Sequence, residues 1–418
     1  AAVLAVTFAA AARWTSENGA AFAYTRVAFG DDVGFYVGLT RFVGAAIAWG
    51  VMATAVVTTV LTVFGGHEAV TTTNITIGFV LLMVVLLAIN LAGTRITKVV
   101  NNISTIGKVA ALVLTIVAGL VVLAMTGDNH FSDLTHLEGP DGSPLVPSMD
   151  TTAFVGAMLA AFYAFTGFEG AGSAASEMED PARNLPRAIP IGVAVVIVVY
   201  VAVVSVAMMI NPTGVLESKD AVVLASAFDN SIVRDLIVLG ALVSMFGINV
   251  AASFNTPRIF DAMSRRRMLP AAASRTSQRG VPVVAFVVTA VLAIVVPMAF
   301  GYSMRGIMVI SSVTRFVQFV MVPLALILCF LGRTRHRPND VKRSVVLDVV
   351  FPILSIAASV FLMVEFDWRG QFSNPGGGLN LWAVAAMIVG YVVLPAALYL
   401  PWKLGVYDDT PKQLPEDR

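Results

Sequence analysis

The fold of this chain is decided by the stretch TAFVGAMLAAFYAFTGFEGAGSAAS (152–176). It is long and apolar enough for a helix that crosses a membrane, which needs about 20 residues. Three glycines between positions 167 and 172, together with Glu169, interrupt it past its midpoint. Glycines alone indicate close helix packing, whereas an acidic residue is costly at that depth and marks a functional site. We therefore predict a helix that is broken near Thr166–Gly167.

A broken helix exposes main-chain groups that a continuous helix would satisfy. The carbonyl groups that end the first half attract an ammonium, and the N–H groups that begin the second half attract a carboxylate. Secondary transporters bind their substrates at such breaks near the middle of the bilayer. A small zwitterion fits this pair of helix ends.

The composition of the whole chain is that of a membrane protein. Of its 418 residues, 57% are hydrophobic and 13% are charged, whereas soluble proteins carry about 25% charged residues. We predict an all-α polytopic membrane protein with one transmembrane domain over 1–418, because unbroken apolar runs exclude a barrel of short alternating strands. The eleven apolar segments span 1–12, 33–63, 75–93, 99–125, 152–176, 188–210, 233–257, 282–300, 306–332, 345–366 and 380–402.

Positive charge predicts the orientation of the loops. One alternating set of loops, which includes the tail 403–418, carries 20 of the 27 lysines and arginines, and the opposite set carries 4. The first set is therefore predicted to face the cytoplasm, and the acidic loop 126–151 to be extracellular. Eleven crossings then place residue 1 on the outer side or inside the bilayer, so we expect one further helix upstream, with the first helix of the working protein missing from this chain.

Several stretches resemble one family of membrane proteins. The segment FYAFTGFEGAGSAASEMEDPARNLPRAIP (162–190) resembles the sixth helix and following loop of amino acid permeases of the amino acid–polyamine–organocation superfamily. Similar stretches in the same order are SENGAAFAYTRVAFGDDVGFYVG (16–38), VNNISTIGKVAALVL (100–114), NTPRIFDAMSRRRMLP (255–270) and ISSVTRFVQFVMVPLA (310–325). The resemblance implies a five-plus-five inverted repeat with two extra C-terminal helices, in which broken first and sixth helices hold the substrate. No first helix of the Gly-Ser-Gly type is present, so half of that site has no counterpart here.

The candidate substrate-binding residues surround the predicted break. The resemblance implies that Tyr163, Thr166 and Phe168 line the pocket, with main-chain contacts at Phe165 and Gly167. The alternative for the aromatic residues is a place in the core or against lipid. Two polar residues four apart on another segment, Asn249 and Ser253, either border the site or form hydrogen bonds between helices.

Three charged residues inside apolar segments are candidates for coupling or gating. The resemblance aligns Lys108 with a lysine that takes the place of a sodium ion in sodium-independent or proton-coupled members; the alternative is a lysine whose amine reaches the membrane surface. Glu169 is either a proton-responsive gate or a structural partner. Arg41, like Arg315, is expected in an ion pair, although an arginine fork can also hold the second carboxylate of an acidic substrate.

Together these features predict a secondary active transporter of amino acids that works by alternating access. It is expected to be independent of sodium and either proton-coupled or exchanging; the alternatives are a polyamine or other amine transporter of the same fold and a non-transporting sensor. No catalytic motif of a membrane enzyme is found, and the single cysteine, Cys329, with four scattered histidines predicts no metal site. The expected partners are the substrate, protons and the lipid bilayer of a bacterial cell membrane, without a cofactor or nucleic acid. The identity of the amino acid and the oligomeric state stay open.

Overall fold

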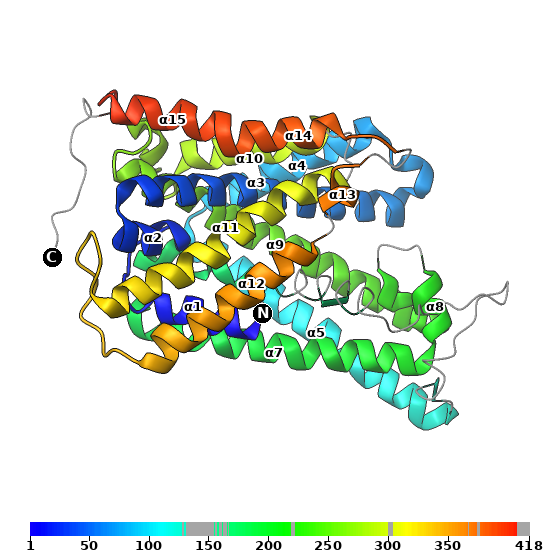
Figure 1. Ribbon diagram of the computed structural model, residues 1–418. Coiled ribbons are helices and arrows are strands. Elements are labelled where there is room, and N and C mark those ends of the chain that lie inside the picture. Colours follow the sequence, from blue (N-terminus) through cyan, green and yellow to red (C-terminus); the bar gives the residue numbers. More distant parts are fainter. Residues whose placement is uncertain are drawn as a thin grey trace.

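The protein is helical throughout the part of the chain that the structure describes (Figure 1). This computed structural model describes residues 1–127, 129–130, 154, 157–158, 161, 165, 167–218, 222–299, 304–366, 368–373 and 377–407. Those residues form helices, connecting loops and two isolated β-bridges, and they contain no strand. The prediction of an all-α membrane protein is confirmed.

Eight helical spans within the described residues are long and apolar enough to cross a membrane. Long apolar runs become helices in lipid because only a helix satisfies its backbone polar groups within one segment. Large apolar side chains such as Phe64 (79% exposed) and Ile106 (69%) lie on their outer faces and suit contact with lipid. The spans are α3 (Asp31–Gly65), α4 (Thr72–Leu91), α5 (Thr94–Thr126), α7 (Pro181–Ile210), α9 (Ser231–Arg265), α11 (Met304–Leu331), α12 (Phe351–Glu365) with the π-helical turn η6 (Val346–Val350) before it, and α14 (Leu381–Ile388) continued through η7 (Val389–Val393) into α15 (Leu394–Lys403).

Two shorter apolar helices complete the match with ten of the eleven predicted segments. They are α1 (Ala2–Ala11) and α10 (Val283–Ala299). Most of the eleventh segment, 152–176, lies outside the described residues up to position 166. Three short helices, α8 (Pro212–Glu217), η4 (Val223–Ala227) and α13 (Trp368–Gln371), lie in connections at the end of the bundle opposite α2 (Figure 1).

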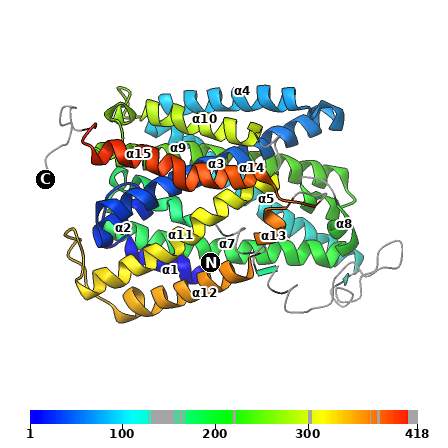
Figure 2. The same ribbon diagram turned by 45° about the horizontal axis from the view of Figure 1, so that its top comes forward.

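Helix α3 forms the centre of the bundle and packs against α2 (Ala21–Phe29), α9, α10 and α11. In Figure 1 it lies between the red α14–α15 segment and α11, and in Figure 2 the same red segment crosses in front of it. Two glycines permit this approach: an added Cβ at Gly44 would overlap the side chain of Thr314, and one at Gly50 would overlap the carbonyl oxygen of Ala293. Small residues of this kind let membrane helices pack closely.

The loops predicted to share one side of the membrane do gather at one end of the bundle, on the left in Figure 1. The main-chain N–H of His336 donates to Val27 O at 3.1 Å, and the Arg279 side chain donates to Leu91 O at 3.2 Å. The segment 13–32, predicted as a loop, contains the buried helix α2 at this end. Its nine residues are too few to cross a membrane, so apolar length gave no signal for it.

Each of the two π-helical turns directs one polar side chain into the protein. Asp348 in η6 is 0% exposed, pairs with Arg13, and accepts hydrogen bonds from Trp14 Nε1 (3.4 Å) and Ser344 N (2.8 Å). Tyr391 in η7 is 7% exposed and forms a hydrogen bond with Thr314 of α11. Such turns insert a residue into a helix and often occur at functional positions. Here they connect the C-terminal helices to the segment after α1 and to α11.

Candidate functional site

The main chain departs from α-helical geometry at Gly167. Its φ angle is +121°, a value that residues with a side chain rarely adopt. The 3-10 helix η3 (Phe168–Glu177) follows, whereas just before the glycine Phe165 N still bonds to Ala161 O in the helical i−4 pattern, at 3.3 Å. The predicted interruption is therefore confirmed at Gly167.

Glu169 fills the main-chain donor position that this break creates. The side chain is 2% exposed, and its Oε2 accepts a hydrogen bond from Gly167 N at 2.7 Å. An N–H group that begins a helical segment is a favourable place for a carboxylate. The site expected to hold the carboxylate of a substrate thus holds a carboxylate of the chain itself.

Two arginines from different helices approach the same carboxylate. Arg41 Nη1 of α3 lies 3.8 Å from Glu169 Oε1, and Arg315 Nε of α11 lies 3.9 Å from that oxygen. The two arginine side chains are 11% and 15% exposed. Both distances exceed the range of a hydrogen bond. Glu169 therefore attracts both arginines electrostatically while the two arginines repel each other, and no hydrogen bond joins either guanidinium to Glu169.

A contact between α3 and α11 places these two arginines. Thr314 Oγ1 donates to Thr40 O at 3.1 Å and is also hydrogen-bonded to the hydroxyl of Tyr391. Thr40 and Thr314 are 0% and 1% exposed, so this contact lies in the interior. Each threonine directly precedes one arginine in the sequence. The register that joins the threonines therefore also turns Arg41 and Arg315 toward η3.

Three phenylalanine rings form an apolar wall beside Glu169. The ring of Phe8 in α1 lies 5.7 Å from those of Phe168 and Phe319, and the last two are stacked at 6.2 Å. Phe319 lies one helical turn after Arg315, so both residues face η3 from the same side of α11. The wall keeps water from one side of the charged cluster, which strengthens the electrostatic interactions there.

Main-chain hydrogen bonds hold η3 against the segment before α2. Gly19 N donates to Ser173 O at 3.2 Å, and Ala20 N donates to Gly172 O at 3.3 Å. An added Cβ at Gly172 would overlap the hydroxyl of Tyr24, so any side chain there would have to displace this tyrosine. Burial raises the pKa of Tyr24 well above its ordinary value, and its hydroxyl is therefore neutral.

The groups in this cluster can bind a ligand through its charges and through main-chain hydrogen bonds. Among the described residues, no three His, Cys, Asp or Glu side chains lie close enough to hold a metal ion. What the cluster offers is an anionic group beside a helix break, two cations and an aromatic wall. A sequence model of amino acid permeases matches residues 1–396 of this chain.

The chain belongs to the amino acid permease family. Curated relatives of this permease are also transporters. An uncharacterised transporter of Mycobacterium tuberculosis is 40% identical over 414 residues, which cover 95% of the permease and 84% of the relative. A serine/threonine exchanger of Bacillus subtilis is 26% identical over 284 residues, 66% of the permease and 60% of the exchanger. A D-serine/D-alanine/glycine transporter of Escherichia coli is 31% identical over 211 residues, 48% and 43% of the two chains.

The structure brings together four of the residues that the sequence singled out, namely Gly167, Phe168, Glu169 and Arg41. Phe165 points elsewhere, since its ring lies 5.4 Å from that of Tyr200 on α7. Tyr163 and Thr166, both predicted to line the pocket, lie outside the described residues. The structure therefore describes the break mainly from Gly167 onward.

Asn249 and Ser253 lie in a different interface of the permease, between α9, α3 and α4. Asn249 Nδ2 donates to Met52 O of α3 at 3.4 Å, and Asn90 of α4 donates to Ser253 Oγ at 2.9 Å. Both residues are almost fully buried, at 0% and 1% exposed. These are the hydrogen bonds between helices that the sequence left as the alternative to a place at the site.

Lys108 lies on α5, half-buried, and no described contact joins it to the cluster around Glu169. One turn earlier, Ser104 Oγ donates to Val243 O of α9 at 2.9 Å, which fixes this part of α5 against α9. The role of Lys108 in coupling stays a prediction that rests on the family resemblance.

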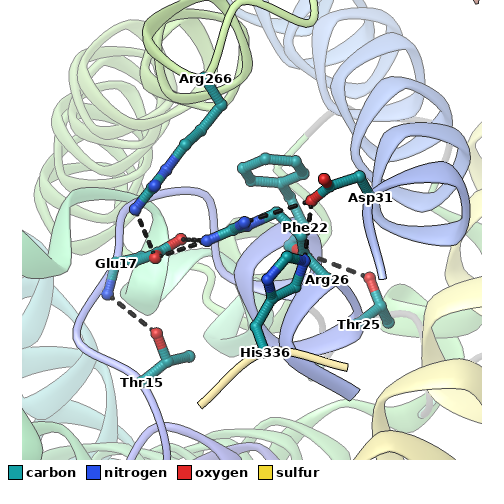
Figure 3. Close-up of polar contacts among 8 residues, drawn as sticks. All are labelled: Thr15, Glu17, Phe22, Thr25, Arg26, Asp31, Arg266 and His336. Carbon is teal, nitrogen blue, oxygen red and sulfur yellow. Dashed lines mark hydrogen bonds and ion pairs between the residues drawn. The ribbon is translucent and has the colours of Figure 1, made fainter. Parts of the chain in front are cut away.

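A second charged cluster ties three segments together at the basic end of the bundle (Figure 3). Glu17 accepts hydrogen bonds from Arg26 Nη2 at 2.7 and 2.9 Å and from Arg266 at the end of α9 at 2.6 Å. Arg26 also donates to Asp31 at 3.2 Å, and His336 lies 3.0 Å from the same Asp31 oxygen. These contacts link the segment before α2, the end of α9 and the loop after α11.

Sequence reasoning did not place Phe8, Phe319 or Tyr391 at the site. Each lies on an apolar helix where an aromatic side chain is ordinary, so only the packing distinguishes it. Nothing in the sequence distinguishes Glu17 from other acidic residues, which are common in basic loops. Its two arginine partners are 9 and 249 positions away along the chain.

Proposed function

We propose that this permease is a secondary active transporter of amino acids that works by alternating access. The observation that carries the proposal is the interrupted main chain at Gly167, with buried Glu169 bonded to it and two arginines beside it. Non-helical backbone is tolerated inside a membrane only where it is buried in protein or lines a cavity. Charged groups are costly inside a membrane, and where they occur they mark a binding or coupling site by default.

The break supplies what a zwitterion needs. In the family resemblance the substrate lies between two broken helices, and this chain provides the second of them. In such a break the carbonyl groups that end the first half attract an ammonium and the N–H groups that begin the second half attract a carboxylate, although Glu169 already accepts from Gly167 N. The phenylalanine wall accommodates apolar atoms. Binding of this kind needs no covalent step, in agreement with a family of transporters.

The Glu17 cluster serves as the closed end of the pathway in this proposal. Its hydrogen bonds join the end of α9 to the segment that holds η3 by the Gly19 and Ala20 main chain. Opening of that end requires separation of Glu17 from Arg26 or Arg266. In accordance with the excess of positive charge, this end faces the cytoplasm of a bacterial cell and places the C-terminal tail there.

We further propose that transport is independent of sodium, with Lys108 in place of the ion as the resemblance implies. The test uses the purified permease in proteoliposomes, with mixtures of radiolabelled amino acids outside and with sodium or potassium as the external cation. Uptake is expected to be the same in both salts. Uptake that requires sodium and survives a protonophore would contradict the proposal.

The same vesicles separate coupled uptake from exchange and a transporter from a sensor. Uptake that falls with a protonophore indicates proton coupling, and uptake that requires unlabelled amino acid inside indicates exchange. A protein that amino acids stabilise against heat, yet that never accumulates them, is a sensor with a transporter fold. Stabilisation by polyamines alone would identify the other amine substrate class.

A further inference from the structure

Within the part of the chain that the structure describes, no hydrogen-bond acceptor is joined to the guanidinium of Arg41, inside the span of α3. Its nearest anionic atom is Glu169 Oε1 at 3.8 Å, which is beyond hydrogen-bond range. Its Nε is buried and has no partner among the described residues. Buried guanidinium groups normally donate several hydrogen bonds, and a carboxylate matches two of them at once. The arrangement leaves one edge of the Arg41 guanidinium available to bind a carboxylate.

Glu169 does not satisfy this arginine because its carboxylate is divided among several donors. One oxygen accepts the Gly167 N–H at 2.7 Å, and the other lies almost equally far from Arg41 and Arg315, at 3.8 and 3.9 Å. A carboxylate that served only to neutralise Arg41 would form a close, hydrogen-bonded pair. The cluster has instead the form of an anion site in which the protein's own carboxylate occupies part of the space.

Gly170 of η3 lies beside the guanidinium of Arg41 and has no side chain to cover it. An added Cβ at this position would lie 3.5 Å from Arg41 Nη2, which is ordinary van der Waals contact. The Arg41 side chain is 11% exposed, whereas that of Glu169 is 2% exposed. A small group can therefore reach the arginine more readily than it can reach the glutamate.

We propose that Arg41 binds a carboxylate on the side chain of the transported amino acid, and that Glu169 competes with it for the same cations. This inference rests on the proposed function and names its substrate class: acidic amino acids. Two cations beside one carboxylate repel lysine, arginine and polyamines, and a neutral side chain leaves the edge of Arg41 without an acceptor. A site that hydrogen-bonds a polar group rejects the analogue that lacks it.

The first test compares ligands that differ only in charge, and it uses the unmodified protein. The thermal stability of the purified permease is measured with glutamate, glutamine, aspartate, asparagine and putrescine at equal concentrations. Glutamate and aspartate are expected to raise the melting temperature more than their amides, and putrescine is expected to have no effect. Equal stabilisation by each acid and its amide would overturn the inference.

The second test uses Arg41→Gln in proteoliposomes with labelled glutamate and labelled serine. Loss of a charge-assisted interaction is expected to raise the KM for glutamate by about tenfold or more, while the KM for serine changes less than about threefold. Glu169→Gln removes the competing anion and is expected to lower the KM for glutamate. Equal changes for both substrates in Arg41→Gln would show that the arginine is structural.

Arg258→Gln is the matched control. Arg258 is likewise a buried arginine, 2% exposed, and its Nη1 donates to Phe254 O, one turn earlier on α9, at 2.6 Å. It is expected to alter stability without altering the ratio of the two KM values. A permease that transports serine but neither binds nor transports glutamate refutes the substrate class alone. A protein that is neither stabilised by any amino acid nor takes one up refutes the proposed function.

Discussion

Asp348→Asn is expected to weaken the junction between the C-terminal helices and the rest of the bundle. The carboxylate is 0% exposed, pairs with Arg13 (17% exposed) and accepts Ser344 N at 2.8 Å. The amide keeps the shape of the side chain but removes its charge and turns one acceptor into a donor. The half-buried Arg13 then loses its counter-charge.

The expected cost follows from burial. Breakage of a buried ion pair costs about 3–5 kcal/mol, and the lower end applies because Arg13 retains some contact with solvent. At about 2 °C for each kcal/mol, as found for larger domains, the melting temperature should fall by about 6 °C. The C-terminal helices should separate first, because the contact joins η6 to the segment after α1.

Cys329 provides the assay. It is the single cysteine of the chain, is 4% exposed, and packs with Trp14 beside Asp348. A maleimide that fluoresces on reaction with a thiol therefore reports when this region opens on heating. The temperature of half-maximal reaction is compared for the unmodified permease and Asp348→Asn in the same detergent.

Asp32→Asn is the matched control at the same end of the bundle. Asp32 also forms an ion pair, with Lys403, but the two side chains are 59% and 44% exposed. Exposed pairs contribute little, so this variant should shift the transition by less than about 2 °C. Equal shifts for the two variants would refute the argument from burial. A double-mutant cycle with Arg13→Gln should show coupling of at least about 1 kcal/mol.

Two further predictions concern the segments that hold η3 and the charged end of the bundle. Gly172→Ala should lower both thermal stability and uptake. Addition of Tyr24→Phe should restore both, because it removes the hydroxyl that the new Cβ overlaps. As a control, Gly192→Ala on α7, where nothing lies within 4 Å of an added Cβ, should be neutral or mildly stabilising. Glu17→Gln leaves two arginines facing each other and should shift the permease toward the conformation open at that end, measured as faster labelling of a cysteine introduced there into a Cys329→Ser background. Unchanged labelling would mean that the cluster does not hold that end closed.

Most of the membrane-spanning structure was predictable from the sequence because hydrophobic length is a local property. Ten of the eleven predicted segments coincide with helices, and the interruption at Gly167 followed from glycines beside an acidic residue. The buried helix α2 was not predicted, since its nine residues are too short for that rule. The two π-helical turns were not predicted either, because their sequences resemble ordinary apolar helix.

The candidate site was predictable only in part. Glu169 and Arg41 were singled out as charges within apolar segments, and the structure shows that they lie together. Asn249 and Ser253 carried an equally good polar signal, yet their hydrogen bonds join other helices. A polar residue in a membrane segment must find a partner, and the sequence does not tell whether that partner is a substrate or a neighbouring helix.

The amino-acid sequence alone determined that this protein crosses a membrane with apolar helices and that one of them is interrupted, because both properties follow from the energetic cost of placing particular residues in lipid. Only the tertiary structure decided that Arg41 and Arg315, from helices far apart in the chain, approach the same carboxylate. That choice depends on which faces of α3 and α11 pack together, and on the Thr314–Thr40 hydrogen bond that sets their register. Which charges interact depends on the distance between them in space, and that distance is fixed only when the helices pack together.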